Sequence, residues 1–272
     1  MIDTTTNLYC IFGKPVKHSK SPAVHNACFE HYNIKAVYLA FEIDDIESGI
    51  KAIKTLDIKG ASITIPFKET IFKYLDFVDD DTLNIGAVNT IVNKNNKLYG
   101  YNTDFIASIC PLKSFGIAGK KVCIIGAGGA AKAIAYGIHK EKGKIIIVNR
   151  SKQRGEELSF KYNADFILAE DLKKINKLDV DVLINTTSIG MSPYHDKDSP
   201  FSSHLLSKDM IVMDIVYNPI ETRLLYEAKN KDCKIINGLS MFVYQAALQF
   251  ELWTKILPDL NIMKKALIIK AK

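Results

Sequence analysis

The sequence has few cysteines, and no two of them have the spacing of a metal or redox motif. Five occur in 272 residues, and none belongs to a CxxC pair: Cys10, Cys28, Cys110, Cys123 and Cys233. A chain of this length buries a large apolar core and needs neither disulfides nor a structural metal. We therefore expect reduced, mostly buried thiols in a reducing compartment.

Long uninterrupted apolar runs are also missing. The longest apolar stretch, residues 122–137, contains Lys132 and several glycines, so it is not a candidate membrane span. The first residues lack the basic start of a signal peptide. These features predict a soluble, cytoplasmic protein that does not enter a membrane.

No strong excess of either charge is present. The chain has 36 Lys and Arg against 30 Asp and Glu, a net charge of +6. Its densest basic stretches, residues 113–121 and 140–144, are short and mixed with apolar residues. A nucleic-acid surface needs clustered basic residues beside exposed aromatics. We expect no nucleic-acid partner, and an anionic small molecule fits this charge equally well.

Apolar runs that predict strands alternate with segments of helical spacing along most of the chain. Strands are expected at residues 9–13, 37–41, 60–65, 121–125, 144–149, 181–185 and 210–215, and helices include 22–32, 44–56 and 240–257. This alternation predicts an α/β protein with mostly parallel sheets covered by helices. A polar turn at 93–96 closes a hairpin, and a second βαβ series begins near residue 120. We expect two domains, residues 1–104 with 240–272, and residues 105–239.

A glycine-rich turn follows the strand at 121–125 and opens a helix. Its sequence, Gly-Ala-Gly-Gly-Ala-Ala at 126–131, has the form GxGxxA. The first glycine permits a tight turn, the second lets a pyrophosphate approach the backbone, and the small third residue allows close packing. The helix N-terminus offers unpaired N–H groups to phosphates. The second domain is therefore predicted to be a Rossmann-type, doubly wound dinucleotide-binding domain, with a purely structural glycine turn as the alternative. The predicted contacts are Gly126, Ala127, Gly128, Gly129 and Ala130.

The end of the next strand decides which dinucleotide is expected. NAD-binding units usually carry an acidic residue there for the ribose hydroxyl. This strand instead ends in Asn149, Arg150 and Ser151, with Arg154 one helical turn later. Two guanidinium groups suit a 2′-phosphate, so the sequence predicts NADP. The alternative is that both arginines are solvated helix charges and that Ser151 is only a helix N-cap.

Further polar motifs follow one another along the chain. They are Ser-Lys-Ser-Pro at 19–22, Thr-Ile-Pro-Phe-Lys at 64–68, Gly-Ala-Val-Asn-Thr at 86–90, Asn-Thr-Asp at 102–104, Asn-Thr-Thr-Ser-Ile-Gly-Met at 185–191, Asp-Ile-Val-Tyr-Asn-Pro at 214–219 and Asn-Gly-Leu-Ser-Met at 237–241. Singly, each has an ordinary explanation as a cap, strand or turn. As an ordered series they resemble the shikimate dehydrogenase family over nearly the whole chain.

The resemblance implies reversible reduction of 3-dehydroshikimate to shikimate with NADPH, in aromatic amino-acid biosynthesis. No metal is indicated by the sequence, and a monomer or homodimer is expected. The implied substrate contacts are Ser19, Ser21, Thr64, Lys68, Asn89, Asp104, Tyr217 and Gln245. The implied cofactor contacts are Asn149, Arg150, Ser151 and Arg154 at the adenosine phosphate, Thr186, Ser188 and Ile215, and Met213 and Gly238 near the nicotinamide.

The residue chemistry agrees with this substrate class. Hydroxyl and amide side chains can donate to and accept from the carboxylate and hydroxyls of a polyhydroxy acid. Reducing a ketone with a hydride also requires a proton for the oxygen, and Lys68 with Asp104 is the candidate acid–base pair. The alternative is a structural Lys–Asp ion pair.

Three positions depart from the family pattern. Ser62 stands where relatives often have Asn, and Phe105 and Ala107 stand where relatives usually have Gly. Three other functions are kept open: a dual-specificity quinate/shikimate dehydrogenase, a non-catalytic shikimate-binding sensor, and a structural cofactor-binding module of a larger assembly.

Overall fold

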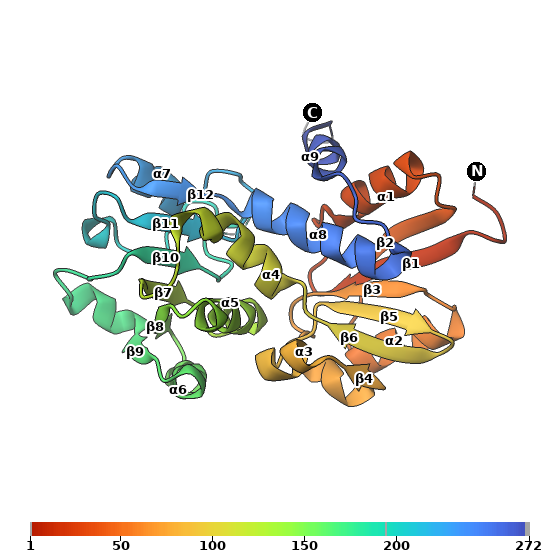
Figure 1. Ribbon diagram of the computed structural model, residues 1–272, viewed down its shortest axis with the longest axis horizontal. Coiled ribbons are helices and arrows are strands. Elements are labelled where there is room, and N and C mark those ends of the chain that lie inside the picture. The colour runs from red at the N-terminus through yellow and green to blue at the C-terminus, as the bar shows by residue number, and fades with distance from the viewer. Residues whose placement is uncertain (1, 194, 270–272) are drawn as a thin grey trace. The chain divides into compact units, whose positions relative to one another are not determined.

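The computed structural model describes residues 2–193 and 195–269 and divides into two compact units (Figure 1). The first unit runs to Thr103 and resumes at Val243, and the second is Asp104–Phe242. Each unit contains one six-stranded sheet. In the part of the chain described, no helix is both long and apolar enough to cross a membrane.

The sheet of the first unit is mixed, with the strand order β2-β1-β3-β5-β6-β4. Its strands are β1 (Asn7–Gly13), β2 (Ala36–Glu42), β3 (Gly60–Ile63), β4 (Phe77–Val78), β5 (Thr90–Lys94) and β6 (Lys97–Tyr101). The strand β1 pairs in parallel with β2 and β3, whereas β5 is antiparallel to both β3 and β6. Asn95 and Asn96 form the two-residue turn between β5 and β6 with φ of 53° and 63°, as a primed hairpin turn requires.

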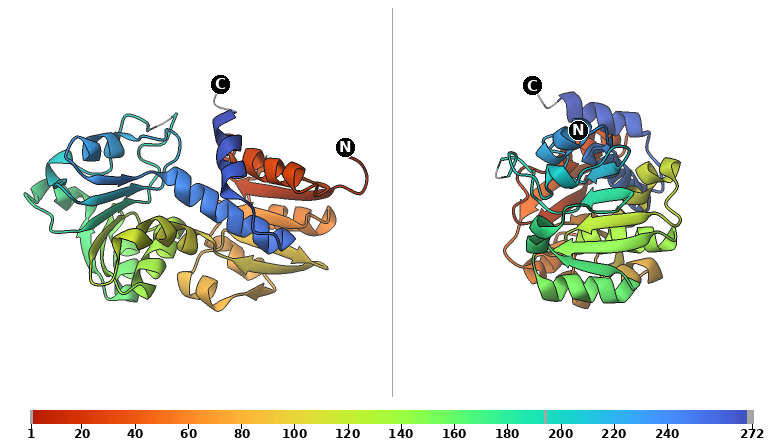
Figure 2. Two further views of the ribbon diagram at one scale, coloured as in Figure 1. Left: turned by 45° about the horizontal axis from the view of Figure 1, so that its top comes forward. Right: turned by 90° about the vertical axis from the view of Figure 1, so that its left-hand side faces the viewer.

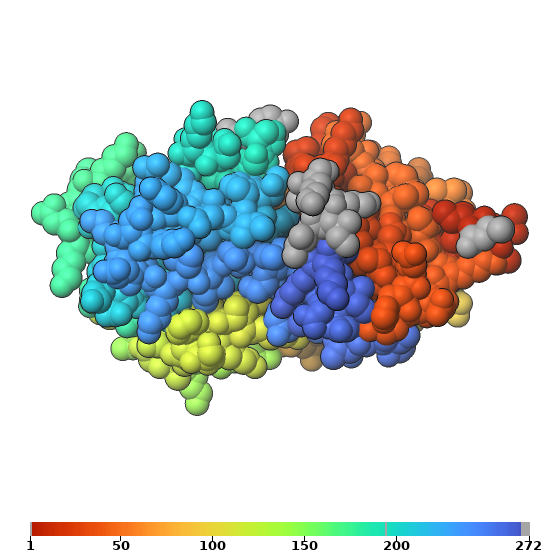
Figure 3. Space-filling model, turned by 90° about the horizontal axis from the view of Figure 1, so that it is seen from above, coloured from red at the N-terminus to blue at the C-terminus, as the bar shows by residue number. Residues whose placement is uncertain are grey.

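Helices cover both faces of this sheet. They are α1 (Ser21–His31), α2 (Ile46–Thr55), α3 (Asp80–Ile85), the part of α8 (Gly238–Thr254) from Val243 onward and α9 (Leu260–Ile269), with the short 3₁₀ helix η1 (Thr70–Tyr74). The side chains of β1 alternate between the faces. Cys10 and Phe12 pack in one cluster with the isoleucines of α2, while Tyr9 contacts Phe29 of α1 and Trp253 of α8, with ring centroids 5.2 Å apart in both cases. The last helix, α9, lies against α1 (Figure 3).

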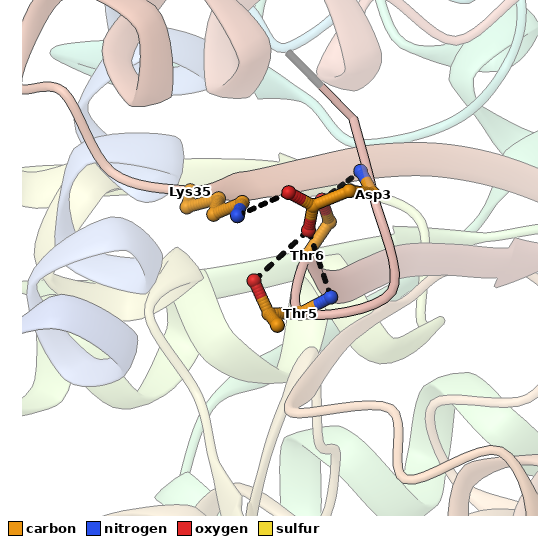
Figure 4. Close-up of polar contacts among 4 residues, drawn as sticks. All are labelled: Asp3, Thr5, Thr6 and Lys35. Carbon is orange, nitrogen blue, oxygen red and sulfur yellow. Dashed lines mark hydrogen bonds and ion pairs between the residues drawn. The ribbon is translucent and has the colours of Figure 1, made fainter.

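A small polar cluster holds the turn that precedes β1 (Figure 4). The Asp3 carboxylate accepts hydrogen bonds from the N–H and hydroxyl of Thr5, both at 2.9 Å, and pairs with Lys35. The Asp3 N–H donates to the Thr6 hydroxyl at 2.9 Å. The ion pair with Lys35 and the bonds from Thr5 lower the pKa of Asp3. This cluster joins the start of β1 to the residue that precedes β2.

The second unit has an all-parallel sheet with the order β12-β11-β10-β7-β8-β9 (Figure 2, right). Its strands are β7 (Lys121–Ile125), β8 (Lys144–Asn149), β9 (Asp165–Leu168), β10 (Val182–Asn185), β11 (Ile211–Asp214) and β12 (Lys234–Ile236). Counted from β7, this is the order 3-2-1-4-5-6 of the dinucleotide-binding fold. The predicted α/β class and doubly wound sheet are confirmed.

The helices of this unit pack against its strands or against one another. They are α4 (Asp104–Ile109), α5 (Gly129–Lys140), α6 (Lys152–Tyr162) and α7 (Arg223–Lys229), with the 3₁₀ helices η2 (Cys110–Phe115), η3 (Ala169–Lys174) and η4 (Ser203–Leu205). The helix α5 contacts β7 and β8, α6 contacts β8 and β9, and α7 contacts β11 and β12.

The departures from the family pattern at 105 and 107 lie on α4, which packs against α5. Phe105 meets Tyr136 edge-on, with ring centroids 5.4 Å apart, and Ala107 is fully buried. Neither residue has a positive φ. Both are therefore accommodated within the packing of the second unit without strain in their own backbone.

His25 of α1 is fully buried in an aromatic cluster of the first unit. Its ring stacks on Tyr38 at 4.4 Å between centroids and lies 5.1 Å from the ring of Trp253. Burial lowers the pKa of His25 to about 3, and the nearby Gln249 side chain offsets only part of this shift. His25 is therefore a neutral core residue and is not placed to be a metal ligand or a proton donor.

We predict that acid destabilises the protein through His25. The unfolded chain takes up a proton on this residue near pH 6.5, whereas the folded chain does so only near pH 3, so protons favour unfolding between these values. Between pH 6.5 and about pH 4, the free energy of unfolding should fall by roughly 3 kcal/mol more in the wild type than in a His25→Phe variant. Urea unfolding at several pH values measures this free energy. The same dependence on pH in the two proteins would contradict the prediction.

Candidate active site

One edge of the sheet in the first unit gathers most of the predicted substrate residues. The strands β1, β3 and β6 end at this edge and β5 begins there, because β5 runs antiparallel to its neighbours. The motifs at 19–22, 64–68 and 102–104 follow the three strand ends, and the motif at 86–90 leads into β5. The fold thus brings four polar motifs, distant in sequence, to one side of the sheet.

The loops after β1 and β3 touch at Gly13. A Cβ atom at this position would lie 2.2 Å from Cγ2 of Thr64, so only glycine allows this approach. The Thr64 N–H donates to the carbonyl of Phe12 at 3.0 Å, and the Lys14 N–H donates to the carbonyl of Ile65 at 2.9 Å. These contacts hold Thr64, which is half-buried, beside the loop that carries the serine motif.

The two predicted serines lie where that loop enters α1. Ser21 is the first residue of the helix and is buried, and its N–H donates to Oγ of Ser19 at 3.2 Å. The N-cap position belongs to Lys20, whose side chain makes no capping bond, and Pro22 occupies the first turn. The Ser19 hydroxyl therefore serves the start of the helix, whose positive end faces the same loop.

Lys68 lies on the segment that leads from β3 to η1. Its carbonyl accepts from the Val88 N–H at 2.8 Å, and the Asn89 carbonyl accepts from the Ile63 N–H at 2.8 Å. Lys68 is half-buried and interacts with other groups of the protein. These backbone bonds bring the segments of Thr64, Lys68 and Asn89 together.

The Asn89 side chain makes hydrogen bonds to Thr103, the residue at which the chain leaves the first unit. Its Oδ1 accepts from the Thr103 N–H and its Nδ2 donates to the Thr103 hydroxyl, both at 2.9 Å. The Thr103 hydroxyl also contacts the carbonyl of Gln245 at 3.2 Å. Thr103 is thus a structural member of the site to which the sequence analysis gave no role. Its position inside the Asn-Thr-Asp motif was the available signal.

The other two predicted substrate residues belong to the second unit. Asp104 is the first residue of α4, directly after Thr103 in the chain, and is buried. Tyr217 packs on Phe242, with ring centroids 4.3 Å apart. Their contacts with the substrate and the pairing of Asp104 with Lys68 remain predictions.

The glycine-rich turn has the form that the sequence predicts. Gly126 follows β7 with a φ of 114°, and a Cβ there would lie 2.4 Å from the Thr186 hydroxyl oxygen. That hydroxyl donates to the Ile125 carbonyl at 2.6 Å. Gly126 is therefore required twice, by its backbone conformation and by the close approach of Thr186 from the neighbouring strand end.

Neither packing nor backbone conformation requires glycine at position 128. Gly128 is the N-cap residue of α5, and no atom lies within 4 Å of the position of an added Cβ. Its space is therefore open, although its φ of −88° would suit any residue. An open cradle at a helix N-terminus fits a pyrophosphate, so the chain's residues suit the dinucleotide that the fold implies.

The predicted adenosine-phosphate residues surround the turn between β8 and α6. Arg150 and Arg154 are both exposed, and Ser151 is the N-cap residue of α6 without a side-chain capping bond. The Asn149 amide donates to the Ser151 carbonyl at 2.8 Å and braces the turn. The structure thus places both guanidinium groups at the start of one helix.

A buried carboxylate joins the two loops that follow β10 and β11. Asp214 accepts from the Asn185 amide and the Val216 N–H, both at 3.0 Å, and from the Thr222 hydroxyl at 2.7 Å. Burial raises the pKa of Asp214 to about 6, although these three hydrogen bonds lower it. Asn185 also binds Thr187 and the Ile189 carbonyl, so the loop that carries Thr186 and Ser188 is braced from Asp214. Asn185 and Asp214 lie in two of the sequence motifs, but no local pattern marks their bracing role or that of Thr222.

Two of the predicted cofactor residues, Gly238 and Ile215, meet where α8 begins, and a third, Met213, lies in β11. A Cβ at Gly238 would lie 2.3 Å from the Ile215 carbonyl oxygen, so the helix starts directly on the loop after β11. Ile215 is half-buried, and Met213 is fully buried in β11. The structure thus brings Gly238 and Ile215 together, and the cofactor contacts of all three stay predictions.

Comparison with known proteins agrees with this geometry. Family sequence models match three segments: the shikimate dehydrogenase substrate binding domain at residues 11–91, shikimate/quinate 5-dehydrogenase at 111–223 and the shikimate 5′-dehydrogenase C-terminal domain at 238–268. A shikimate dehydrogenase (NADP(+)) of Caldanaerobacter subterraneus subsp. tengcongensis is 43% identical over 265 residues, which cover 93% of each chain. This chain belongs to the shikimate dehydrogenase family. The resemblance predicted from the sequence motifs is confirmed.

Solved structures of family members match the chain over nearly their whole length. A shikimate dehydrogenase in complex with NADP⁺ has a TM-score of 0.90 and 40% identity, and the match covers 100% of this chain and 98% of the other. A shikimate 5-dehydrogenase of Thermus thermophilus in complex with NADP(H) and shikimate has a TM-score of 0.85 and 32% identity, with 96% and 98% covered.

The two glycines of the turn should respond differently to alanine. Gly128→Ala should leave the unfolding midpoint unchanged and weaken NADPH binding at least about tenfold, because its Cβ enters the phosphate cradle. Gly126→Ala should lower the unfolding midpoint, since both its φ and the Thr186 hydroxyl oppose a side chain. Thermal unfolding and fluorescence titration with NADPH measure the two effects. Wild-type affinity in Gly128→Ala would contradict the assignment of the cradle.

Proposed function

We propose that this protein catalyses the reversible NADP-dependent interconversion of 3-dehydroshikimate and shikimate, a step toward the aromatic amino acids. Residues of the first unit, with Asp104 and Tyr217 of the second, bind the substrate, and other residues of the second unit bind the cofactor. The observation that carries the proposal is the gathering of four polar motifs at one sheet edge, in a chain with the family's dinucleotide turn. The relatives named above support it, because their names or complexes include shikimate and NADP.

The edge of the first sheet at which β1, β3 and β6 end is called the substrate edge. It has the donors and acceptors that a polyhydroxy acid requires. The hydroxyls of Ser19 and Ser21 lie at the positive end of α1, which suits a carboxylate. Thr64 and Asn89 lie on neighbouring segments of the same edge and suit the ring hydroxyls. In this proposal Gln245, whose carbonyl is near Thr103, and Tyr217 complete the substrate contacts.

The proton chemistry falls to Lys68 and Asp104. When bound, NADPH supplies a hydride to the ketone carbon of 3-dehydroshikimate. The Lys68 ammonium donates the proton to the ketone oxygen, so that one N–H bond breaks and one O–H bond forms. In the reverse direction the Lys68 amine takes this proton back. The Asp104 carboxylate accepts hydrogen bonds from Lys68 and from a substrate hydroxyl, which orients both.

Turnover by the purified chain tests the proposal. NADPH consumption is followed with 3-dehydroshikimate, in parallel with NADH and with 3-dehydroquinate. We expect rapid turnover only with NADPH and 3-dehydroshikimate. Comparable rates with NADH or 3-dehydroquinate would instead indicate the broader quinate/shikimate specificity. Ligand binding without turnover in any combination would contradict the proposal and favour a sensor.

Removing the Lys68 amine should abolish most of the chemistry. Lys68→Ala should lower kcat at least about 100-fold and change KM for shikimate less than about threefold, because the proton is transferred in the transition state. Steady-state kinetics measure both constants. Lys14→Ala, which removes an exposed lysine paired with Asp44 at the same sheet edge, is the matched control and should behave as wild type. Wild-type turnover in Lys68→Ala would reject the role.

The two arginines after β8 should determine the choice of cofactor. Arg150→Ala and Arg154→Ala should each raise KM for NADP⁺ about tenfold or more and leave KM for NAD⁺ within about twofold, since only NADP⁺ has the 2′-phosphate. Arg223→Ala, which removes an arginine paired with Glu227 on α7, is the control for charge loss in this unit. Equal effects on both cofactors would show that the arginines do not contact the 2′-phosphate.

A further inference from the structure

A chain of buried hydrogen bonds connects Tyr38 of β2 with Asn89 at the substrate edge. Its members are all at most 5% exposed: Tyr38, Ser62, Gln249, Thr90 and Asn89. The Tyr38 hydroxyl donates to Ser62 Oγ at 2.6 Å, and the Ser62 hydroxyl donates to Gln249 Oε1 at 2.8 Å. Gln249 Nε2 donates to the Asn89 carbonyl at 3.1 Å and to Thr90 Oγ1 at 3.0 Å. The Thr90 hydroxyl donates to Asn89 Oδ1 at 2.7 Å.

The backbone determines the direction of these bonds at both ends. The Asn89 carbonyl can only accept, so the Gln249 atom facing it must be Nε2, and Oε1 must face Ser62. The Thr103 N–H can only donate, so the Asn89 atom facing it must be Oδ1. The Thr90 hydroxyl lies between these two fixed amides. Because it accepts from Gln249, its own proton points to Asn89 Oδ1.

Gln249 lies four residues after Gln245 on α8, and the two therefore lie on the same face of the helix. The Gln249 amide uses one oxygen and both of its N–H groups within the chain of bonds. It touches both the backbone of Asn89 and the hydroxyl that orients the Asn89 side chain. No site motif includes Gln249, Tyr38 or Thr90 in a substrate role.

We propose that Gln249 is a positioning residue for the substrate. It acts through Thr90 to hold the Asn89 amide so that Oδ1 faces Thr90 and Thr103 and Nδ2 can donate a hydrogen bond to the substrate. This inference rests on the proposed function, in which Asn89 contacts shikimate. Ser62 and Tyr38 hold Gln249 itself, so the Ser62 hydroxyl serves the protein and not the substrate. The departure at position 62 is thereby given a structural role.

A double-mutant cycle on kcat/KM for shikimate tests the inference with wild type, Gln249→Met, Asn89→Ala and the double variant. Gln249→Met keeps the side-chain length and loses the hydrogen bonds. It should lower kcat/KM about tenfold through KM for shikimate, while KM for NADP⁺ changes less than about twofold. In the Asn89→Ala background the same change should cost less than about twofold, because its effect passes through Asn89. Additive losses in the two backgrounds would overturn the inference.

A matched pair at Thr90 tests the same path without a change on α8. Thr90→Val keeps the shape of this fully buried side chain and removes its hydroxyl, so it should reproduce the higher KM for shikimate. Thr90→Ser keeps the hydroxyl and should stay within about twofold of wild type. Wild-type kinetics in Thr90→Val would overturn the inference. If the wild-type protein itself did not turn over shikimate, the proposed function would fail first, and this inference with it.

Discussion

The pair of hydrogen bonds between Asn89 and Thr103 is the constraint on which the substrate edge depends. One bond uses the backbone of Thr103 and the other its side chain, so the amide is held at two points. Thr103 is the last residue of the first unit before Asp104. The position at which the chain leaves this unit is therefore tied to the residue that the proposed function places on the substrate. Asn89 thus has three connections. Its carbonyl bonds to Ile63 of β3, its side chain holds the residue at which the chain leaves the first unit, and the proposed function places it on the substrate.

The second unit depends on close approaches between backbone segments at its own sheet edge. Gly126 admits the Thr186 side chain, and Gly238 admits the Ile215 carbonyl. The buried Asp214 then joins the loops after β10 and β11 through Asn185, Val216 and Thr222. Such a carboxylate costs free energy to bury unless its hydrogen bonds are satisfied, and three donors reach it here. Small residues and one buried acid thus shape the loops that the proposal assigns to the cofactor.

Local sequence patterns predict the long buried strands, but they do not predict contacts between residues that are far apart in the chain. The strands β7, β8, β10 and β11 are recognisable because each is a run of apolar residues buried on both faces of a parallel sheet. The strands β4, β9 and β12 have two to four residues and are only partly buried, so periodicity does not reveal them. The Ser62–Gln249 bond joins residues 187 positions apart, and no local pattern marks it. The family motifs predict which side chains gather at the edge, whereas the residues that orient them become visible only in the structure.

The most direct test of the account is a crystal structure of the protein with shikimate and NADP⁺ both bound. We expect the Lys68 ammonium and the Asp104 carboxylate to lie within hydrogen-bond distance of the reacting hydroxyl of shikimate. Asn89 Nδ2 should face another hydroxyl of the ring, and Arg150 and Arg154 should contact the 2′-phosphate. Shikimate bound with its reacting hydroxyl away from Lys68 and Asp104 would contradict the account.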